Sequence, residues 1–229
     1  MEATPAQRPL NWLEIWRMAF LRPTIDTFSR IMSDPKASIK WGIFWSGIST
    51  LILWILGPQR TLLWDLVANQ FALEAASYFV VIGTIAFPIL GVIAMLINAA
   101  ISHGLSKLFA GAGTFQQLVF CWGVMQPPFI LFSGLALYIL PYLYSIFRLL
   151  SSSETNFSVL RIIYLISLLI AVAGVLYLFY AQVVALSAVE KFSIGKGLGI
   201  LILSACVLGI ASACLSIGLQ AVVLKSLRY

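Results

Sequence analysis

The chain has 229 residues, of which 61% are apolar and only 10% are charged. Soluble domains contain about 25% charged and about 45–50% apolar residues, so this composition excludes an ordinary soluble domain and indicates a membrane protein. The net charge of +6 comes from lysines and arginines at the ends of apolar segments. That placement fits anionic lipid headgroups, and without a basic run we expect no nucleic-acid binding.

Cysteine usage and motif content exclude further classes of protein. Cys121, Cys206 and Cys214 lie inside apolar stretches without a CxxC pattern, so we expect small apolar side chains rather than disulfides or a zinc site. The first 40 residues carry too many charges for a cleavable signal peptide. A Ser-His-Asp set, paired carboxylates, HExxH and Walker motifs are all missing, so we predict neither an enzyme nor a cofactor.

Residues 1–38 are predicted to form a tail and two amphipathic helices outside the bilayer core. Asn11 can cap a helix beginning at Trp12, Pro23 ends it, and Asp34-Pro35 ends the next helix. Tryptophans beside arginines are typical of a helix in the membrane interface. The residues expected to contact lipid or a protein partner are Trp12, Trp16, Arg17 and Phe20. The alternative is that both helices only pack on the membrane bundle.

Residues 39–229 contain five apolar stretches that approach or exceed the length of one bilayer crossing, which is about 20 helical residues. The predicted spans are residues 41–56, 78–101, 115–140, 162–189 and 198–224. The first is slightly short, and residues 60–76 are predicted to form a short amphipathic helix after it. The fold class is therefore all-α: a polytopic membrane helix bundle with about five transmembrane helices and N-terminal interfacial amphipathic helices.

Prolines and small residues interrupt these spans. Pro88 is expected to kink the second span, where neighbouring helices must satisfy the freed carbonyl. Residues 115–147 exceed one crossing, and Pro127-Pro128 lies within them. We favour one kinked span ending near Leu140, the alternative being a hairpin of two half-spans turning at the prolines and Gly134. In the fifth span four small residues share one face, which predicts close helix contact there; they are Ala205, Gly209, Ser212 and Ser216.

A basic, glycine-containing stretch separates the second and third spans. It is predicted to begin as a turn in which His103 and Lys107 flank Gly104, and Gly111 and Gly113 allow further turns of the backbone. Glycines beside a lysine are also a feature of phosphate-binding loops. The spacing is not GxxxxGK[ST] and no strand precedes it, so we do not expect a nucleotide site.

Thr114 and Gln117 are spaced as a capping box for a helix beginning at Phe115. His103 is the only histidine of the chain. At a bilayer edge we expect it to form hydrogen bonds rather than to act as a catalyst, and no other metal-ligating side chain is nearby to complete a metal site.

These features resemble the Yip-domain family, named for eukaryotic members that interact with Ypt and Rab GTPases. The similar stretch runs from residue 103 to 117 and continues at Gln126-Pro127-Pro128. Residues 183–197 resemble the family's last loop, and Phe28 and Ile31 followed by Asp34-Pro35 are also similar, so the resemblance extends over residues 20–225. The family-like loop positions are His103, Lys107, Gly111, Gly113, Thr114 and Pro127.

The resemblance implies a prokaryotic-type member. The Asp-Leu-Tyr-Gly-Pro signature of eukaryotic members and their long polar N-terminal domain are absent from this sequence. Rab-type GTPase binding is therefore in doubt. We expect an integral protein of a prokaryotic cytoplasmic membrane.

The distribution of basic residues predicts the orientation. With five spans, nine of the 14 lysines and arginines fall on the side of the N-terminus and five on the other. Cytoplasmic segments carry the excess of positive charge, so the N-terminus is predicted to be cytoplasmic.

Two functions are compatible with this sequence. The first is a non-enzymatic membrane-organising protein, accessory subunit or scaffold, as the Yip resemblance implies, with the bilayer and a membrane protein or a second copy as partners. The second is a small oligomeric transporter or channel that uses the proline and glycine breaks. The predicted spans carry no charged residue in their cores, where proton-driven transporters usually place one.

Overall fold

The computed structural model describes residues 8–56, 73–134 and 157–226 of the chain. Over these ranges the chain forms helices and no strands, which confirms the predicted all-α class. Two short helices, α1 (Trp12–Leu21) and α2 (Ile25–Met32), precede the long ones. The long helices are α3 (Ile39–Leu56), α5 (Leu73–Leu108), α6 (Phe115–Gly134), α8 (Phe157–Glu190) and α9 (Ile194–Ser226).

The long helices confirm a membrane bundle. Among the described residues, Val81–Leu108, Leu165–Glu190 and Ile194–Cys214 are long and apolar enough to cross a bilayer. Ile39–Ile55 is a shorter apolar helix, in keeping with the slightly short first span that the sequence predicts. Leucines, isoleucines and valines of α5, α8 and α9 point outward, as expected where acyl chains replace water.

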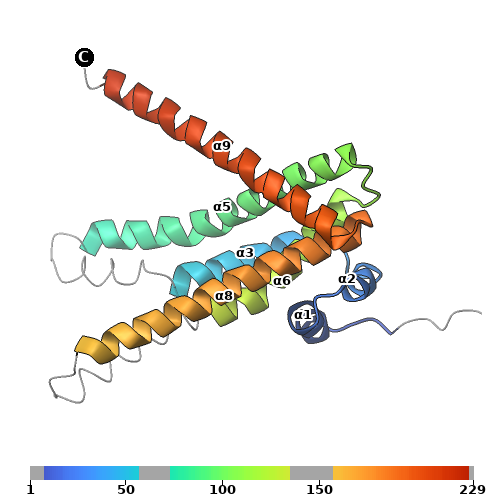
Figure 1. The fold of residues 1–229 in the computed structure, drawn as a ribbon. Helices are drawn as coiled ribbons and strands as arrows, with labels where there is room; N and C mark the ends of the chain where they lie inside the picture. The colour runs from blue at the N-terminus through green and yellow to red at the C-terminus, as the bar shows by residue number, and fades with distance from the viewer. Residues whose placement is uncertain (1–7, 57–72, 135–156, 227–229) are drawn as a thin grey trace, which may run out of the picture.

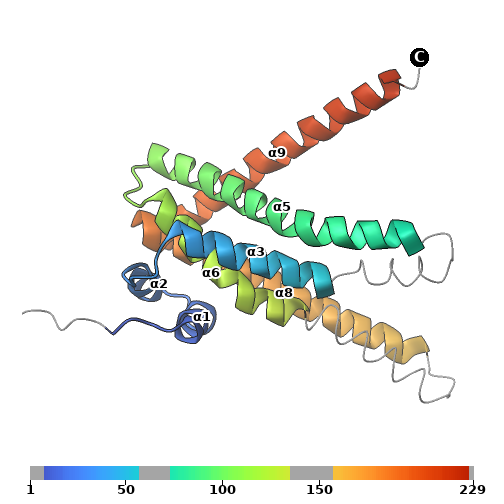
Figure 2. The same cartoon turned by 180° about the vertical axis from the view of Figure 1, so that it is seen from behind.

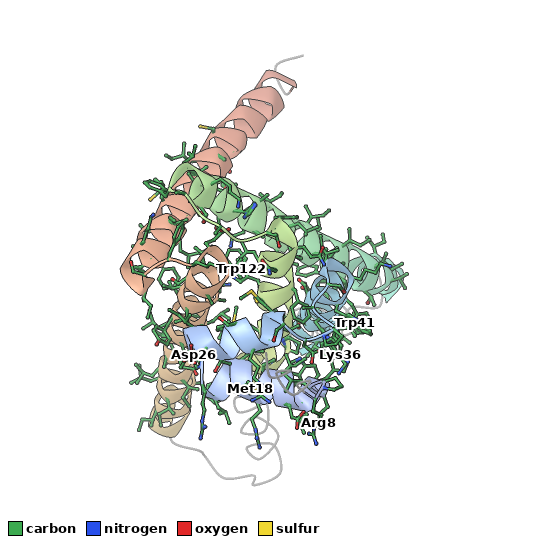
Figure 3. The ribbon with its side chains drawn as sticks, turned by 90° about the vertical axis from the view of Figure 1, so that its right-hand side faces the viewer. Arg8, Met18, Asp26, Lys36, Trp41 and Trp122 are labelled. Carbon is green, nitrogen blue, oxygen red and sulfur yellow. The ribbon has the colours of Figure 1, made fainter. Side chains whose placement is uncertain are left out.

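Helix α6 forms the centre of the bundle and packs against α3, α5, α8 and α1. Residues 118–125 of α6 are buried on every side, including Trp122, whose side chain is labelled in Figure 3. The crossing of α3 and α6 is very close, because a Cβ atom on Gly123 would overlap the backbone of Gly42. A helix that is enclosed in this way fixes the position of every neighbour.

The two N-terminal helices lie across the long helices, and Figure 1 shows both nearly end-on. Ile15 and Ala19 of α1 and Phe28 and Ile31 of α2 are at most 1% exposed. They belong to the same hydrophobic core as the central part of α6 and the last turns of α8. Residues 8–32 and the membrane helices therefore share one core.

One end of the bundle collects the described connections between the long helices. Helix α3 begins there, α5 ends and α6 begins, and α8 ends and α9 begins (Figure 2). The linking segments are short, residues 109–114 and 191–193. Helix α9 contacts α5 and α8 near this end and then leaves the bundle.

The predicted turn at residues 102–108 is wrong, because α5 continues as a helix to Leu108. Ser106 donates a hydrogen bond to the Ser102 carbonyl within the helix, and the Ser102 and Ser204 hydroxyls lie 2.8 Å apart, joining α5 to α9. The chain turns only at Ala110, whose φ is 64°. The Gly111 N–H donates to the Ser106 carbonyl at 2.8 Å, a Schellman end.

Pro127 and Pro128 lie inside α6, which continues as a helix to Gly134, so the chain does not turn at the prolines, as the favoured single span requires. One expectation about α9 is corrected. Gly209 faces open space, and Ala205 and Ser212 are exposed, so the small face of α9 does not pack within the chain as predicted. The reason is that α9 has left the bundle by then. The predicted end near residue 140 and most of the predicted helix at 60–76 lie outside the described residues.

Candidate functional site

The two stretches that resemble the Yip family, residues 103–117 and 183–197, meet at the end of the bundle. Glu190 ends α8 and lies beneath the loop between α5 and α6. Its Oε2 accepts a hydrogen bond from the Gly113 N–H at 2.9 Å, and its carbonyl accepts one from the Ala112 N–H at 3.2 Å. The Glu190 side chain is completely buried. We call Glu190, His103 and the loop residues Ala112 and Gly113 together the Glu190 clasp.

His103 completes the clasp. Its Nδ1 lies 2.6 Å from Oε1 of Glu190, and its side chain is 19% exposed. An ionised carboxylate can only accept hydrogen bonds, so Nδ1 carries the proton when Glu190 is charged. Such a charge-assisted bond is short and strong. The only histidine of the chain thus forms the kind of hydrogen bond expected of it.

Gly111 and Gly113 are needed for space rather than for unusual backbone angles. Neither glycine has a positive φ; in the described residues the left-handed positions are Ala110 and Lys191. A Cβ atom on Gly111 would lie 2.5 Å from Oε2 of Glu190, and one on Gly113 would overlap the Val189 carbonyl. The sequence predicted turns at these glycines, whereas the structure shows close approach of two backbones.

Two lysines donate hydrogen bonds to carbonyl groups of the loop from its outer side. Lys107 Nζ donates to the carbonyls of Gly111 at 3.0 Å and Gly113 at 2.6 Å. Lys196 Nζ donates to the Phe109 carbonyl at 2.6 Å and lies 4.2 Å from the centre of the Phe192 ring. The Phe109 carbonyl directly follows α5, and lysines often satisfy carbonyls at the end of a helix in this way. Lys107 therefore binds the backbone of its own loop.

Thr114 begins α6 as the sequence predicts. Its side chain accepts from the Gln117 N–H at 3.3 Å, and Gln117 Oε1 accepts from the Thr114 N–H at 3.1 Å. This is the expected capping box. Pro127 lies about 20 Å further along α6, at about 1.5 Å per residue, and is not part of the clasp.

A cavity of about 650 Å³ lies between α2, the start of α6 and the turn after α8. Its polar lining includes Ser29 and Ser33 of α2, Thr114 and Gln117 of α6, and Lys191. The clasp forms one wall of this cavity through Gly113. The family-like loop is therefore reachable from outside, although the Glu190 carboxylate beneath it is buried.

The predicted contact residues of α1 occupy two different surroundings. The Trp12 and Trp41 rings are 4.9 Å apart and the Trp16 and Trp45 rings are 4.7 Å apart, and none of these four side chains is fully buried. Arg17 is exposed.

Phe20 lies 5.6 Å from the Tyr177 ring, and its carbonyl accepts a hydrogen bond from the Tyr177 hydroxyl. The three aromatic residues of α1 thus hold the helix on the bundle, as the packing alternative expects. The outward face of α1 consists of other side chains, with Arg17 among them.

Asp34 fixes the chain on either side of the two short helices, a role that sequence reasoning missed. Its carboxylate accepts from the Leu10 N–H at 2.6 Å and the Lys36 N–H at 2.9 Å. Lys36 Nζ donates to the Leu10 carbonyl and lies 5.6 Å from the centre of the Trp12 ring. Figure 3 shows Lys36 beside Trp41 at this edge of the molecule. In the sequence, the aspartate before Pro35 indicated only the end of a helix.

A model of the Yip1 domain matches residues 18–216, most of the chain. The chain belongs to the Yip1 domain family. No curated protein and no solved structure matches it. The Yip1 domain extends from the middle of α1 into α9 and includes both halves of the clasp. The family resemblance seen in the sequence is thereby confirmed.

Sequence reasoning also missed the role of Glu190. From the sequence, Glu190 was recognised only as part of a charged turn in the second family-like stretch, residues 183–197. A signal was present, because a lone acidic residue ending a long apolar helix needs a partner, and the chain has one histidine. Nothing in the order of residues showed that the two stretches would be adjacent.

Proposed function

We propose that this Yip1 domain protein organises membrane or supports other membrane proteins as an accessory or scaffold subunit, without catalysing a reaction. It would reside in a prokaryotic cytoplasmic membrane with its N-terminus in the cytoplasm. The observation that carries the proposal is the outward face of α1, which combines exposed leucines with arginines on a helix fixed across the bundle.

The composition of this face supports contact with a lipid surface or a membrane partner. Leu13 is 72% exposed and Leu21 is 63% exposed, and Arg17 lies between them on the same face of the helix. Arg17, Leu21 and Arg22 line a hollow of about 340 Å³. Exposed leucines beside arginines suit the boundary between headgroups and acyl chains.

The buried face of the same helix explains why this surface is presented rigidly. Ile15 and Ala19 anchor α1 in the core, and Trp12, Trp16 and Phe20 pack on α3, α6 and α8. The exposed edges of these three aromatic residues extend the proposed contact surface. A helix held in this way needs no folding step to bind, so little conformational entropy is lost on contact.

The proposal is tested on the full chain in lipid nanodiscs. A polarity-sensitive fluorophore on Leu13→Cys, with the native cysteines replaced, should report an apolar surrounding, more so with phosphatidylglycerol than with phosphatidylcholine. The double variant Arg17→Glu, Arg22→Glu should lose this preference, and Arg30→Glu on the exposed side of α2 should keep it.

A second measurement separates lipid from protein contact. Purification in mild detergent should recover a stoichiometric membrane protein if α1 binds a partner, and the double arginine variant should lose it. A fluorophore that reports water in every nanodisc, together with recovery of a homo-oligomer alone, would contradict the proposal and favour the transporter alternative.

A further inference from the structure

A groove of about 430 Å³ lies where α9 crosses the end of α5. It is lined by Phe109 of the loop and by side chains on one side of α9. The α9 positions are Lys196, Gly199, Ile200, Ile202, Leu203 and Cys206. Its volume falls within the range of about 300–1,000 Å³ that is usual for ligand sites. None of these residues belongs to the α1 surface of the proposed function.

The groove runs along a segment that can cross a membrane. Lys196, Gly199, Leu203 and Cys206 recur at helical spacing within Ile194–Cys214, one of the candidate spans. A Cβ atom at Gly199 would meet no other atom within 4 Å, so the glycine leaves a notch in the helix surface. The long axis of the groove therefore follows the direction of the acyl chains.

The two ends of the groove differ chemically. Apart from Lys196 its lining side chains are apolar, and Ile202 and Leu203 are 50% and 41% exposed. Lys196 lies in the first turn of α9, where a span meets the headgroups. Leu108 and Phe109 beside it are 80% and 46% exposed, which water would disfavour and lipid would cover.

Lys196 is held in place by the loop and still has N–H donors for a ligand. Its ammonium group donates one hydrogen bond to the Phe109 carbonyl and lies over the Phe192 ring. An ammonium group has three N–H donors, so two remain for an anion. A fixed cation at the end of an apolar groove is complementary to an amphiphile with a negative headgroup.

We propose that this groove binds one anionic phospholipid, with an acyl chain along Gly199, Leu203 and Cys206 and the phosphate against Lys196. The lipid would bridge α9 and the loop after α5, because Lys196 already contacts the Phe109 carbonyl. Bound lipid would thereby cover the groove side of α9 where this helix leaves the bundle.

Native mass spectrometry of the full chain in detergent tests the site, with phosphatidylglycerol and phosphatidylcholine added as separate probes. The wild type should retain one phosphatidylglycerol in preference to phosphatidylcholine. Lys196→Gln should reduce that preference about five-fold, equivalent to about 1 kcal/mol for one basic residue near the surface. Lys196→Arg should restore it.

A second variant fills the groove without disturbing the core. Gly199→Leu places a side chain in the notch and should abolish retention of the lipid. Gly209→Leu is the matched control, because Gly209 is also on α9 with nothing within 4 Å and lies outside the groove. Lys191→Asn is the charge control, since Lys191 is an exposed cation in the link just before α9 and asparagine tolerates its positive φ.

Equal loss in Lys196→Gln and Lys191→Asn would overturn the site, because it would show a general attraction of cations. Unchanged retention in Gly199→Leu would overturn it as well. A dimer of the wild type that Gly199→Leu dissociates would show that a second copy, not a lipid, occupies the groove. Size-exclusion profiles that match the wild type ensure that each variant is folded.

Discussion

Glu190 forms hydrogen bonds to α5 and to the loop after it, through its side chain and its backbone carbonyl. Its two oxygens accept from the Gly113 N–H and pair with His103, and its carbonyl accepts from Ala112. A buried carboxylate without such partners would be costly to desolvate. Its position also explains why residue 111 must be glycine, since a Cβ atom there would press on Oε2.

Glu190→Ala is expected to lower the stability of the folded bundle. Breaking a buried, hydrogen-bonded pair by removing one partner costs about 3–5 kcal/mol. Glu190→Gln should cost less, because its amide oxygen can still accept from Gly113 and its amide can donate to a neutral His103. Thermal unfolding in detergent measures both, with Asp26→Ala on the exposed side of α2 as the control. Equal midpoints for Glu190→Ala and Asp26→Ala would contradict the clasp.

A second residue-scale prediction concerns pH. The hydrogen bond from the Asn11 N–H, together with the charges of Arg8 and Arg17, lowers the pKa of Glu14. The folded state therefore prefers the ionised carboxylate. Its stabilising contribution to the start of α1 is present at neutral pH and is lost as the pH falls through this lowered pKa, below the usual glutamate value of about 4.3.

Hydrogen exchange of residues 8–21 in the full chain measures this effect. After correction for the intrinsic exchange rate, protection of the first turn of α1 should decrease in acid in the wild type. In Glu14→Gln protection should be lower at neutral pH and change little with pH, because the charge is absent throughout. A wild type whose protection is constant across this range would refute the assignment.

At the scale of elements, the crossing of α3 and α6 sets the geometry of the core. Gly42 and Gly123 face each other so closely that either Cβ atom would overlap the backbone of the other helix. Backbone cannot move aside as a flexible side chain can. A Cβ atom on Gly91 or Gly83 would instead overlap a side chain of α3, that of Thr50 or Trp54, so α3 also lies close against α5.

Gly123→Ala should therefore destabilise the bundle, although alanine favours helices. Overpacking a tight core costs about 1–3 kcal/mol, which exceeds the gain of about 0.5–1 kcal/mol from replacing a helical glycine. Gly209→Ala, on the open face of α9, should leave the melting midpoint unchanged or raise it. If Gly123→Ala behaves like Gly209→Ala, the close approach of α3 and α6 is absent in the membrane.

Helix starts could be predicted from the sequence, because local groups determine them. Asn11 with Glu14 and Thr114 with Gln117 form the capping boxes in which side chain and backbone satisfy each other. The ends of α1 and α2 could also be predicted, from Pro23 and from Asp34-Pro35. The end of α5 could not, since α5 passes Gly104 on account of contacts with α9 that are about 100 residues away in the chain. Hydrophobic pattern likewise showed that α9 is apolar, but not that it leaves the bundle.

The candidate site was predicted only in part for the same reason. Local signals marked His103, Gly111 and Gly113 as unusual, and a family resemblance placed them in one loop. Glu190, which explains all three, lies 77 residues beyond Gly113. Its contribution depends on the tertiary packing of α8 beneath the loop, which no short-range pattern encodes.

At the scale of the whole molecule, the bundle has one end rich in connections and cations. The described cations there include Lys107, Lys191 and Lys196, and Arg17 of α1 and Arg22 at its C-terminal end add to them. The start of α8 lies at the opposite end (Figure 2). This excess of positive charge supports our proposal that the connected end lies in the cytoplasm, because cytoplasmic segments retain lysine and arginine.

Cysteine labelling of intact cells and inverted vesicles measures this orientation. Starting from a variant without Cys121, Cys206 and Cys214, single cysteines are introduced at Gly195, where a Cβ atom would meet nothing within 4 Å, and at Arg161 near the start of α8. A membrane-impermeant maleimide should label the Arg161→Cys variant from outside the cell and the Gly195→Cys variant only in inverted vesicles. Labelling of both variants from the same side would mean that α8 does not cross the bilayer. Labelling of Gly195→Cys from outside and Arg161→Cys only in inverted vesicles would reverse the proposed orientation and place the α1 surface outside the cytoplasm.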